Sequence, residues 1–251
     1  MHKIYENQAN YFFLISGGLD SSYGLLKFAL QNRGSKPINL IFFDYGQATA
    51  KYEWESVCKV YDFLSNHFDQ TQTFIEPFKI DLRSMLFSWS NSISFTGKQE
   101  TGMINSHFDI CEIENRNMVI YSILYSYILS LIKKQDISAC EIRVLSGLRN
   151  HELSDASEPF FRYLNQAMLE YHQEYKFVVE FIIDKTPRQI LEALFSIFQN
   201  DKQKILTFCR YTHSCYTSTD GTPCNNCPKC KSINAIIEYL NDIRDKKLQV
   251  G

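Results

Sequence analysis

Short apolar runs alternate with longer amphipathic segments along the first part of the chain. Residues 11–15 and 38–43 are nearly uninterrupted apolar and aromatic runs of strand length. Residues 20–33 and 48–68 carry apolar side chains at helical spacing, and Gly34 stands where a glycine commonly ends a helix. Strands that alternate with helices form parallel sheets with right-handed crossovers. The pattern therefore predicts an α/β fold with a doubly wound parallel sheet.

The same alternation continues, less regularly, through the rest of the chain. The pattern predicts helices at 117–133, 160–172, 187–198 and 232–243, and strands at 142–145 and 177–183. Thr186 and Pro187 are typical of an N-cap and a first helical residue. Residues 84–113 are polar, aromatic and poorly periodic, which is typical of a lid or a binding loop.

The composition is that of a folded protein with nearly balanced charges. Hydrophobic residues make up 45% of the 251 residues, and 26 basic residues stand against 28 acidic ones. Proteins that mainly grip a nucleic-acid backbone usually carry a basic face, so nucleic acid is not the main partner we expect. The N-terminus lacks a long apolar run, and the most apolar segment, 118–132, is short for a membrane span. We therefore expect a cytoplasmic protein that does not enter the membrane.

A segment rich in glycine and serine joins the first predicted strand to the first predicted helix. It consists of Ser16, Gly17, Gly18, Leu19, Asp20, Ser21 and Ser22. The glycines let the backbone approach an anion, and the free N–H groups and dipole of a helix start attract phosphate oxygens. The serine hydroxyls add donors, and Asp20 is a candidate ligand for Mg²⁺ carried by the phosphates. The segment predicts a nucleotide-phosphate site; the plainer alternative is a Gly-Gly turn followed by helix-capping residues.

Four of the eight cysteines cluster near the C-terminus. Cys215, Cys224, Cys227 and Cys230 lie within sixteen residues, and clustered cysteines in a cytosolic protein indicate a metal site. Four thiolates complete a tetrahedral Zn²⁺ shell and leave no open position, so we predict a structural zinc site, with an iron–sulfur cluster as the alternative. The scattered cysteines are expected to be buried or half-buried structural residues: Cys58, Cys111, Cys140 and Cys209.

These two features together resemble a known family. The Ser16–Ser22 loop resembles that of the PP-loop ATP pyrophosphatases, and with the four cysteines the chain resembles the 7-cyano-7-deazaguanine synthase (QueC-like) family. Further matching segments are Asp44-Tyr45-Gly46-Gln47, Asn115-Arg116-Asn117 and Gly147. The resemblance implies an adenine-nucleotide α-hydrolase-like (HUP, PP-loop) fold. In it, residues 1–205 form the PP-loop domain and residues 206–251 form a zinc-binding module with a C-terminal helix.

The resemblance also implies a reaction and a set of site residues. Members of this family activate 7-carboxy-7-deazaguanine with ATP and use ammonia to form an amide and then the nitrile preQ0. The implied catalytic residues are Ser16, Asp20, Ser21 and Arg116. The implied nucleotide-binding residues are the whole loop from Ser16 to Ser22 together with Asp44, Tyr45, Gly46, Gln47, Asn117 and Gly147. Arg116 suits a phosphate or a carboxylate because it is permanently charged and fork-shaped; a surface or capping arginine is the alternative.

Several positions depart from the pattern of the family. Ala48-Thr49 stand where the family usually has Arg-His, Pro187 replaces a lysine, and an arginine usual in the stretch around 152–160 is absent. We therefore expect a diverged member whose carboxylate or amine has changed. The alternatives are an anti-phage defence protein that attaches a deazaguanine to a protein or nucleic acid, a tRNA-modifying PP-loop enzyme, and a non-catalytic nucleotide-binding scaffold. The expected partner is a small deazapurine carboxylate; a protein acceptor, an operon partner and a homodimer stay open.

Overall fold

Five parallel strands form one sheet in the computed structural model, which describes residues 10–32, 37–68, 74–83, 116–134, 141–149, 157–171, 176–183, 185–215, 218 and 220–248. The strands are β1 (Asn10–Leu14), β2 (Ile38–Asp44), β3 (Phe74–Asp81), β4 (Glu141–Arg149) and β5 (Lys176–Ile183). Their order across the sheet is β3-β2-β1-β4-β5. The chain thus winds outward in both directions from β1, and the direction reverses between β1 and β4. Ligands of such sheets bind at the carboxyl ends of the strands flanking that switch point.

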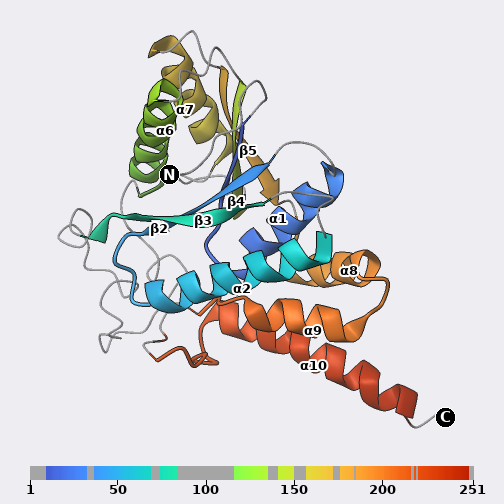
Figure 1. The fold of residues 1–251 in the computed structure, drawn as a ribbon. Helices are drawn as coiled ribbons and strands as arrows, with labels where there is room; N and C mark the ends of the chain where they lie inside the picture. The colour runs from blue at the N-terminus through green and yellow to red at the C-terminus, as the bar shows by residue number, and fades with distance from the viewer. Residues whose placement is uncertain are drawn as a thin grey trace.

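Helices cover both faces of the sheet. They are α1 (Leu19–Gln31), α2 (Ala50–Phe68), α6 (Arg116–Lys134), α7 (Glu158–Tyr171), α8 (Pro187–Ile197), α9 (Lys202–Tyr211) and α10 (Pro228–Leu248). Figure 1 shows α6 and α7 on one side of the sheet and α1, α2 and α8 on the other, with α9 and α10 packed outside α2 and α8. The doubly wound α/β fold is therefore confirmed. Among the described helices, none combines the length and apolarity that crossing a bilayer requires.

Two hydrophobic clusters lie on opposite faces of the sheet. Successive strand residues point to opposite faces, so Phe13 and Leu40 pack with α1, α2, α8, α9 and α10, whereas Phe12 and Ile41 pack with α6 and α7. Every residue of β2 is buried. This two-sided burial explains why the first two strands are nearly continuous apolar runs in the sequence.

Two elements were not predicted from the sequence, and several boundaries differ. Strand β3 and helix α9 are additions, α2 begins at Ala50 rather than at residue 48, and α10 begins at Pro228 and runs to Leu248. The predicted start of α8 is confirmed: Thr186 is the N-cap and forms a capping box with Gln189. The predicted lid at 84–113, Cys111 and Cys140 lie outside the described residues.

The division of the chain at residues 205 and 206 stays a prediction. That position lies inside α9, whose Ile205 and Leu206 belong to the same hydrophobic cluster as Leu25 of α1 and Leu40 of β2. Ile236 and Leu240 of α10 belong to it as well. The C-terminal helices therefore extend the main core.

Candidate active site

The Ser16–Ser22 loop leaves the carboxyl end of β1 and begins α1, so it lies at the switch point of the sheet. Gly17 has φ +74°, in the left-handed region that favours glycine, and a Cβ there would lie 2.5 Å from the backbone oxygen of Glu53. On the other side, a Cβ on Gly147 of β4 would lie 2.5 Å from the Cα of Ser21. The loop is thus held between α2 and β4, and both glycines are required by close approach of backbone.

Ser21 organises this loop from within. The Ser16 N–H donates to the Ser21 hydroxyl at 3.2 Å, and that hydroxyl donates to the Gly18 carbonyl at 3.1 Å. The two serine hydroxyls also lie 3.0 Å apart. Ser16 is exposed while Ser22 is fully buried, and the Ser22 hydroxyl has no hydrogen-bond partner within the described part of the chain. Of the three predicted hydroxyl donors, Ser16 is therefore the one that solvent reaches.

The residues just before the cysteine cluster contact the loop directly. The His213 N–H donates to the Gly17 carbonyl at 2.8 Å, and the Leu19 N–H donates to the Ser214 hydroxyl at 3.1 Å. His213 is partly buried, and this burial lowers its pKa. The sequence did not predict the contact of Ser214. Its hydroxyl oxygen accepts from the Leu19 N–H at the helix start, which is a position where anions bind in related loops.

An ion pair makes a further connection between the cysteine region and the loop. Lys229, between Cys227 and Cys230, places its Nζ 2.7 Å from Oδ2 of Asp20. Asp20 is the second residue of α1, so the pair lies at the start of the helix. The sequence offers no local signal for this contact, because the two residues are 209 positions apart.

The four clustered cysteines converge as predicted. Their sulfur atoms all lie within 4.8 Å of one another, and the Cys224 and Cys230 sulfurs are 3.9 Å apart. Tetrahedral zinc with bonds of about 2.3 Å separates its sulfur ligands by about 3.8 Å. Backbone N–H groups of Cys224, Cys227 and Cys230 also donate to cluster sulfurs at 3.3 to 3.4 Å. Such donors suit thiolates, so the residues present fit a bound metal ion.

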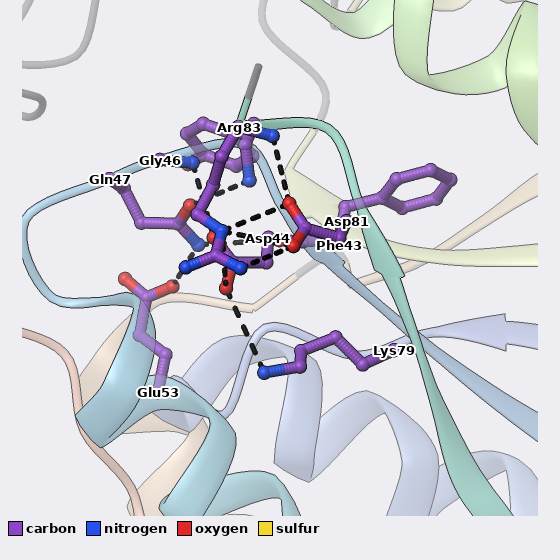
Figure 2. A network of polar contacts seen from close by, with 9 residues as sticks. Phe43, Asp44, Gly46, Gln47, Glu53, Lys79, Asp81 and Arg83 are labelled. Atoms are coloured by element: carbon purple, nitrogen blue, oxygen red, sulfur yellow. Dashed lines mark hydrogen bonds and ion pairs between the residues drawn. The ribbon is translucent and has the colours of Figure 1, made fainter. Parts of the chain in front are cut away.

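The second predicted motif forms a charged network at the end of β2. Asp44 is buried; its Oδ1 accepts from the Gly46 N–H at 3.2 Å, and its Oδ2 lies 3.8 Å from Lys79 and 3.9 Å from Arg83 (Figure 2). Arg83 also pairs side by side with Asp81, whose pKa the arginine hydrogen bonds lower to about 2. Both cations come from the end of β3 or directly after it, so sequence reasoning missed them along with that strand.

Gln47 links this motif to the loop through Glu53 of α2. The Gln47 amide donates to the Glu53 carboxylate at 2.7 Å (Figure 2). The Thr49 hydroxyl also donates to the Glu53 carboxylate, at 2.6 Å. Desolvation raises the pKa of Glu53, although these hydrogen bonds and the charge of Arg116 oppose the rise. Because the backbone oxygen of Glu53 faces Gly17, one residue fixes both the motif and the loop.

Arg116 and Asn117 open α6 beside the same motif. The Arg116 guanidinium lies 5.8 Å from the ring centroid of Tyr45, and Asn117 is buried. The structure therefore brings Arg116 to the second motif, and its catalytic role stays a prediction. Gly147 packs closely against Ser21, and its part in nucleotide binding stays a prediction.

Comparison with known families matches residues 10–238 to the family described as "Queuosine biosynthesis protein QueC". No curated protein sequence matches the chain. Among solved structures, the chain is similar to a U34-tRNA thiolase, NcsA from Methanococcus maripaludis with its [4Fe-4S] cluster. The two are 12% identical, with a TM-score of 0.40 over 95% of this chain and 73% of that chain. So distant a likeness carries no argument about function.

Proposed function

Because the chain belongs to the QueC family of queuosine biosynthesis proteins, we propose that it cleaves ATP at the Ser16–Ser22 loop, adenylates a carboxylate and transfers the acyl group to ammonia or an amine. The observation that carries the proposal is the position of this loop at the switch point of the sheet. Gly17 of the loop packs directly against the backbone of α2, where a Cβ would lie 2.5 Å from the Glu53 oxygen. In this proposal the N–H groups at the start of α1 face the phosphates, and the Ser214 hydroxyl holds the Leu19 N–H until a phosphate oxygen binds.

The proposed reaction has two bond-forming steps. A carboxylate oxygen attacks the α-phosphorus of ATP, the bond from that phosphorus to the oxygen bridging to the β-phosphate breaks, and pyrophosphate leaves with the electron pair. The nitrogen of ammonia or an amine then attacks the carbonyl carbon, the C–O bond to AMP breaks, and nitrogen loses one proton. For a nitrile product, the amide oxygen is adenylated in the same way by a second ATP, and AMP and two protons leave.

The side chains divide between binding and orientation in this proposal. Ser16 and the loop backbone bind the departing pyrophosphate, and Asp20 binds the Mg²⁺ that neutralises it. Ser21 holds the loop in shape, because its hydroxyl is engaged by Ser16 and Gly18. Arg116 binds the α-phosphate or the substrate carboxylate, which its fixed positive charge and fork-shaped donors suit.

The cysteine cluster is proposed to hold structural Zn²⁺. Four sulfur ligands leave no position for a substrate, and three of the four cysteines are buried. Metal analysis of the purified protein will give one zinc per chain under this proposal. A purified protein that absorbs visible light and contains iron and sulfide in place of zinc carries the alternative, an iron–sulfur cluster.

We propose 7-carboxy-7-deazaguanine, or a closely related acid, as the carboxylate. Family membership supports this choice, whereas Ala48, Thr49 and Pro187 replace charged residues of the family pattern. Thr49 has an uncharged side chain, which is buried and hydrogen-bonded to Glu53. We propose that the acceptor amine is the component in which this chain differs from the family reaction.

The test is to incubate the protein with ATP, Mg²⁺, 7-carboxy-7-deazaguanine and ammonia and to separate the products by liquid chromatography with mass detection. AMP and pyrophosphate accompanied by the amide or nitrile support the proposal. AMP and pyrophosphate that require the acid but yield no amide support adenylation with a different amine. Failure of this acid and of related heterocyclic acids to stimulate AMP formation contradicts the proposal.

A further inference from the structure

Lys229 is the described cation that the cysteine cluster presents to the start of α1. Its ammonium group pairs with Asp20 at 2.7 Å, and both side chains retain solvent access, with exposed fractions of 31% and 16%. Partly exposed ion pairs contribute little to stability. The functional interest of this ion pair therefore lies in its position beside the Ser16–Ser22 loop and not in its contribution to stability.

The loop has no lysine of its own, because Asp20, Ser21 and Ser22 follow the two glycines. Before ATP arrives, the Asp20 carboxylate adds a negative charge where a tri- or tetra-anionic ligand is to bind. A loop of this sequence needs a nearby cation to bind polyphosphate, since like charges repel strongly in a partly buried site. Lys229 is at the right place to supply that cation.

We propose that Lys229 binds the β- and γ-phosphates of ATP at the Ser16–Ser22 loop. This inference rests on the proposed ATP-cleaving function and adds a residue to it. In the free protein the Asp20 carboxylate is paired with the Lys229 ammonium group. When MgATP is bound, Asp20 binds the magnesium ion and Lys229 binds the phosphates. Lysine is a compact point charge with three donors, which suits the shared oxygens of two phosphates.

The cysteine cluster fixes where Lys229 stands. Its neighbours Cys227 and Cys230 are buried and their sulfurs converge with those of Cys215 and Cys224, so a metal ion there holds the backbone on both sides of the lysine. The contact of Ser214 with Leu19 holds the same region to the loop from the other side of the cluster. The metal site thereby acquires a role in ATP binding without contacting ATP.

The test compares dissociation constants of the zinc-loaded full chain for ATP, inorganic pyrophosphate and AMP, measured by calorimetry. Lys229→Met will weaken ATP and pyrophosphate binding by about ten- to a hundred-fold, the usual loss for one charge-assisted hydrogen bond. AMP binding will stay unchanged, because AMP lacks both outer phosphates. Lys229→Arg will recover part of the loss. Lys231→Met is the matched control, since Lys231 is exposed on the same helix, and will bind all three ligands as the parent does.

Two results overturn the inference while leaving the proposed function intact. One is that Lys229→Met binds ATP as tightly as the parent; the other is that it loses AMP and ATP affinity equally, which indicates a structural role. A parent protein that binds no ATP overturns the proposed function itself.

Chemical labelling of the parent protein provides a second test that needs no variant. ATP will protect Lys229 from acetylation, AMP will not, and Lys231 will react equally in every case. Equal acetylation of Lys229 with and without saturating ATP contradicts the inference.

Discussion

Gly147 lies where β4 passes the beginning of α1, and a single methyl group there tests how tightly the sheet holds the loop. A Cβ at this position would lie 2.5 Å from the Cα and 2.7 Å from the Cβ of Ser21. Carbon atoms in contact prefer about 3.5–4.0 Å, so Gly147→Ala requires β4 and α1 to separate by about 1 Å. Neither side has a flexible group to move aside, because the closest atom belongs to helix backbone.

Two effects follow from this displacement. Overpacking of this kind lowers the free energy of unfolding by about 1–3 kcal/mol. Moving Ser21, and with it the loop, by about 1 Å also lowers the rate of AMP formation by about a hundred-fold. If the variant remains folded at the assay temperature, partial unfolding cannot account for a hundred-fold lower rate, and the loss is due to the displaced loop.

The assay is urea unfolding followed by circular dichroism, together with the rate of AMP release. Gly18→Ala is the matched control for stability: a Cβ there meets its nearest atom, the Ser214 hydroxyl oxygen, at 3.4 Å, and Gly18 has an ordinary φ of −76°. We expect the control to lose less stability than Gly147→Ala. Equal stability of the two variants, or a Gly147→Ala protein as stable as the parent, refutes the close approach of β4 to the loop.

Three other perturbations test separate parts of the account. Desolvation raises the pKa of Glu53 in the folded protein. The contribution of Glu53 to the free energy of unfolding is therefore largest below about pH 4.5, the ordinary pKa of a carboxyl group, and is lost as the pH rises through the raised pKa. Glu53→Gln will flatten that slope in urea unfolding at several pH values, and an unchanged slope contradicts the assignment. Burial raises the pKa of the Cys209 thiol to about 12; iodoacetamide will therefore alkylate the half-buried Cys58 before Cys209 in the native protein, and the reverse order in peptide mass spectra argues against this burial. Phe208→Ala removes a fully buried ring that packs on Phe63, and will cost about 3–5 kcal/mol of unfolding free energy; a loss below about 1 kcal/mol shows that α9 is not part of the core.

The loop and the cysteine cluster were predictable because their signals are local. A buried strand, two glycines and a helix start follow one another directly, and the four cysteines lie within sixteen residues. Closely spaced residues of this kind carry the chemistry of the site whatever the surrounding fold. The order of strands and helices likewise indicated a parallel sheet before any tertiary contact was known.

Strand β3 was missed for a physical reason. It lies at the edge of the sheet, and its residues Phe74–Asp81 are mostly half-buried or exposed, with Pro77 in the middle. An edge strand needs no continuous apolar run and tolerates proline, here beside a shift in its register with β2. The omission also concealed Lys79 and Arg83, which reach Asp44 only through this pairing. For α9, the N-cap Asp201 and the apolar positions Ile205, Leu206 and Phe208 were an available signal.

The ion pair of Lys229 with Asp20 could not be predicted from the sequence. It joins residues 209 positions apart, and its formation depends on how α10 and the cysteine cluster pack against α1. Motif spacing contains no information about such a contact. The same is true of the contact between Ser214 and Leu19, which joins residues 195 positions apart in the sequence.

Isotope transfer from the acid to AMP tests the central claim most directly. The protein is incubated with ATP, an amine and 7-carboxy-7-deazaguanine that carries ¹⁸O in both carboxylate oxygens, and the mass of the released AMP is measured. If the carboxylate attacks the α-phosphorus, one labelled oxygen stays on that phosphorus when the amine displaces AMP, so AMP will carry one ¹⁸O. Unlabelled AMP formed in ordinary water, or ADP and phosphate as the products, contradicts adenylation of the acid.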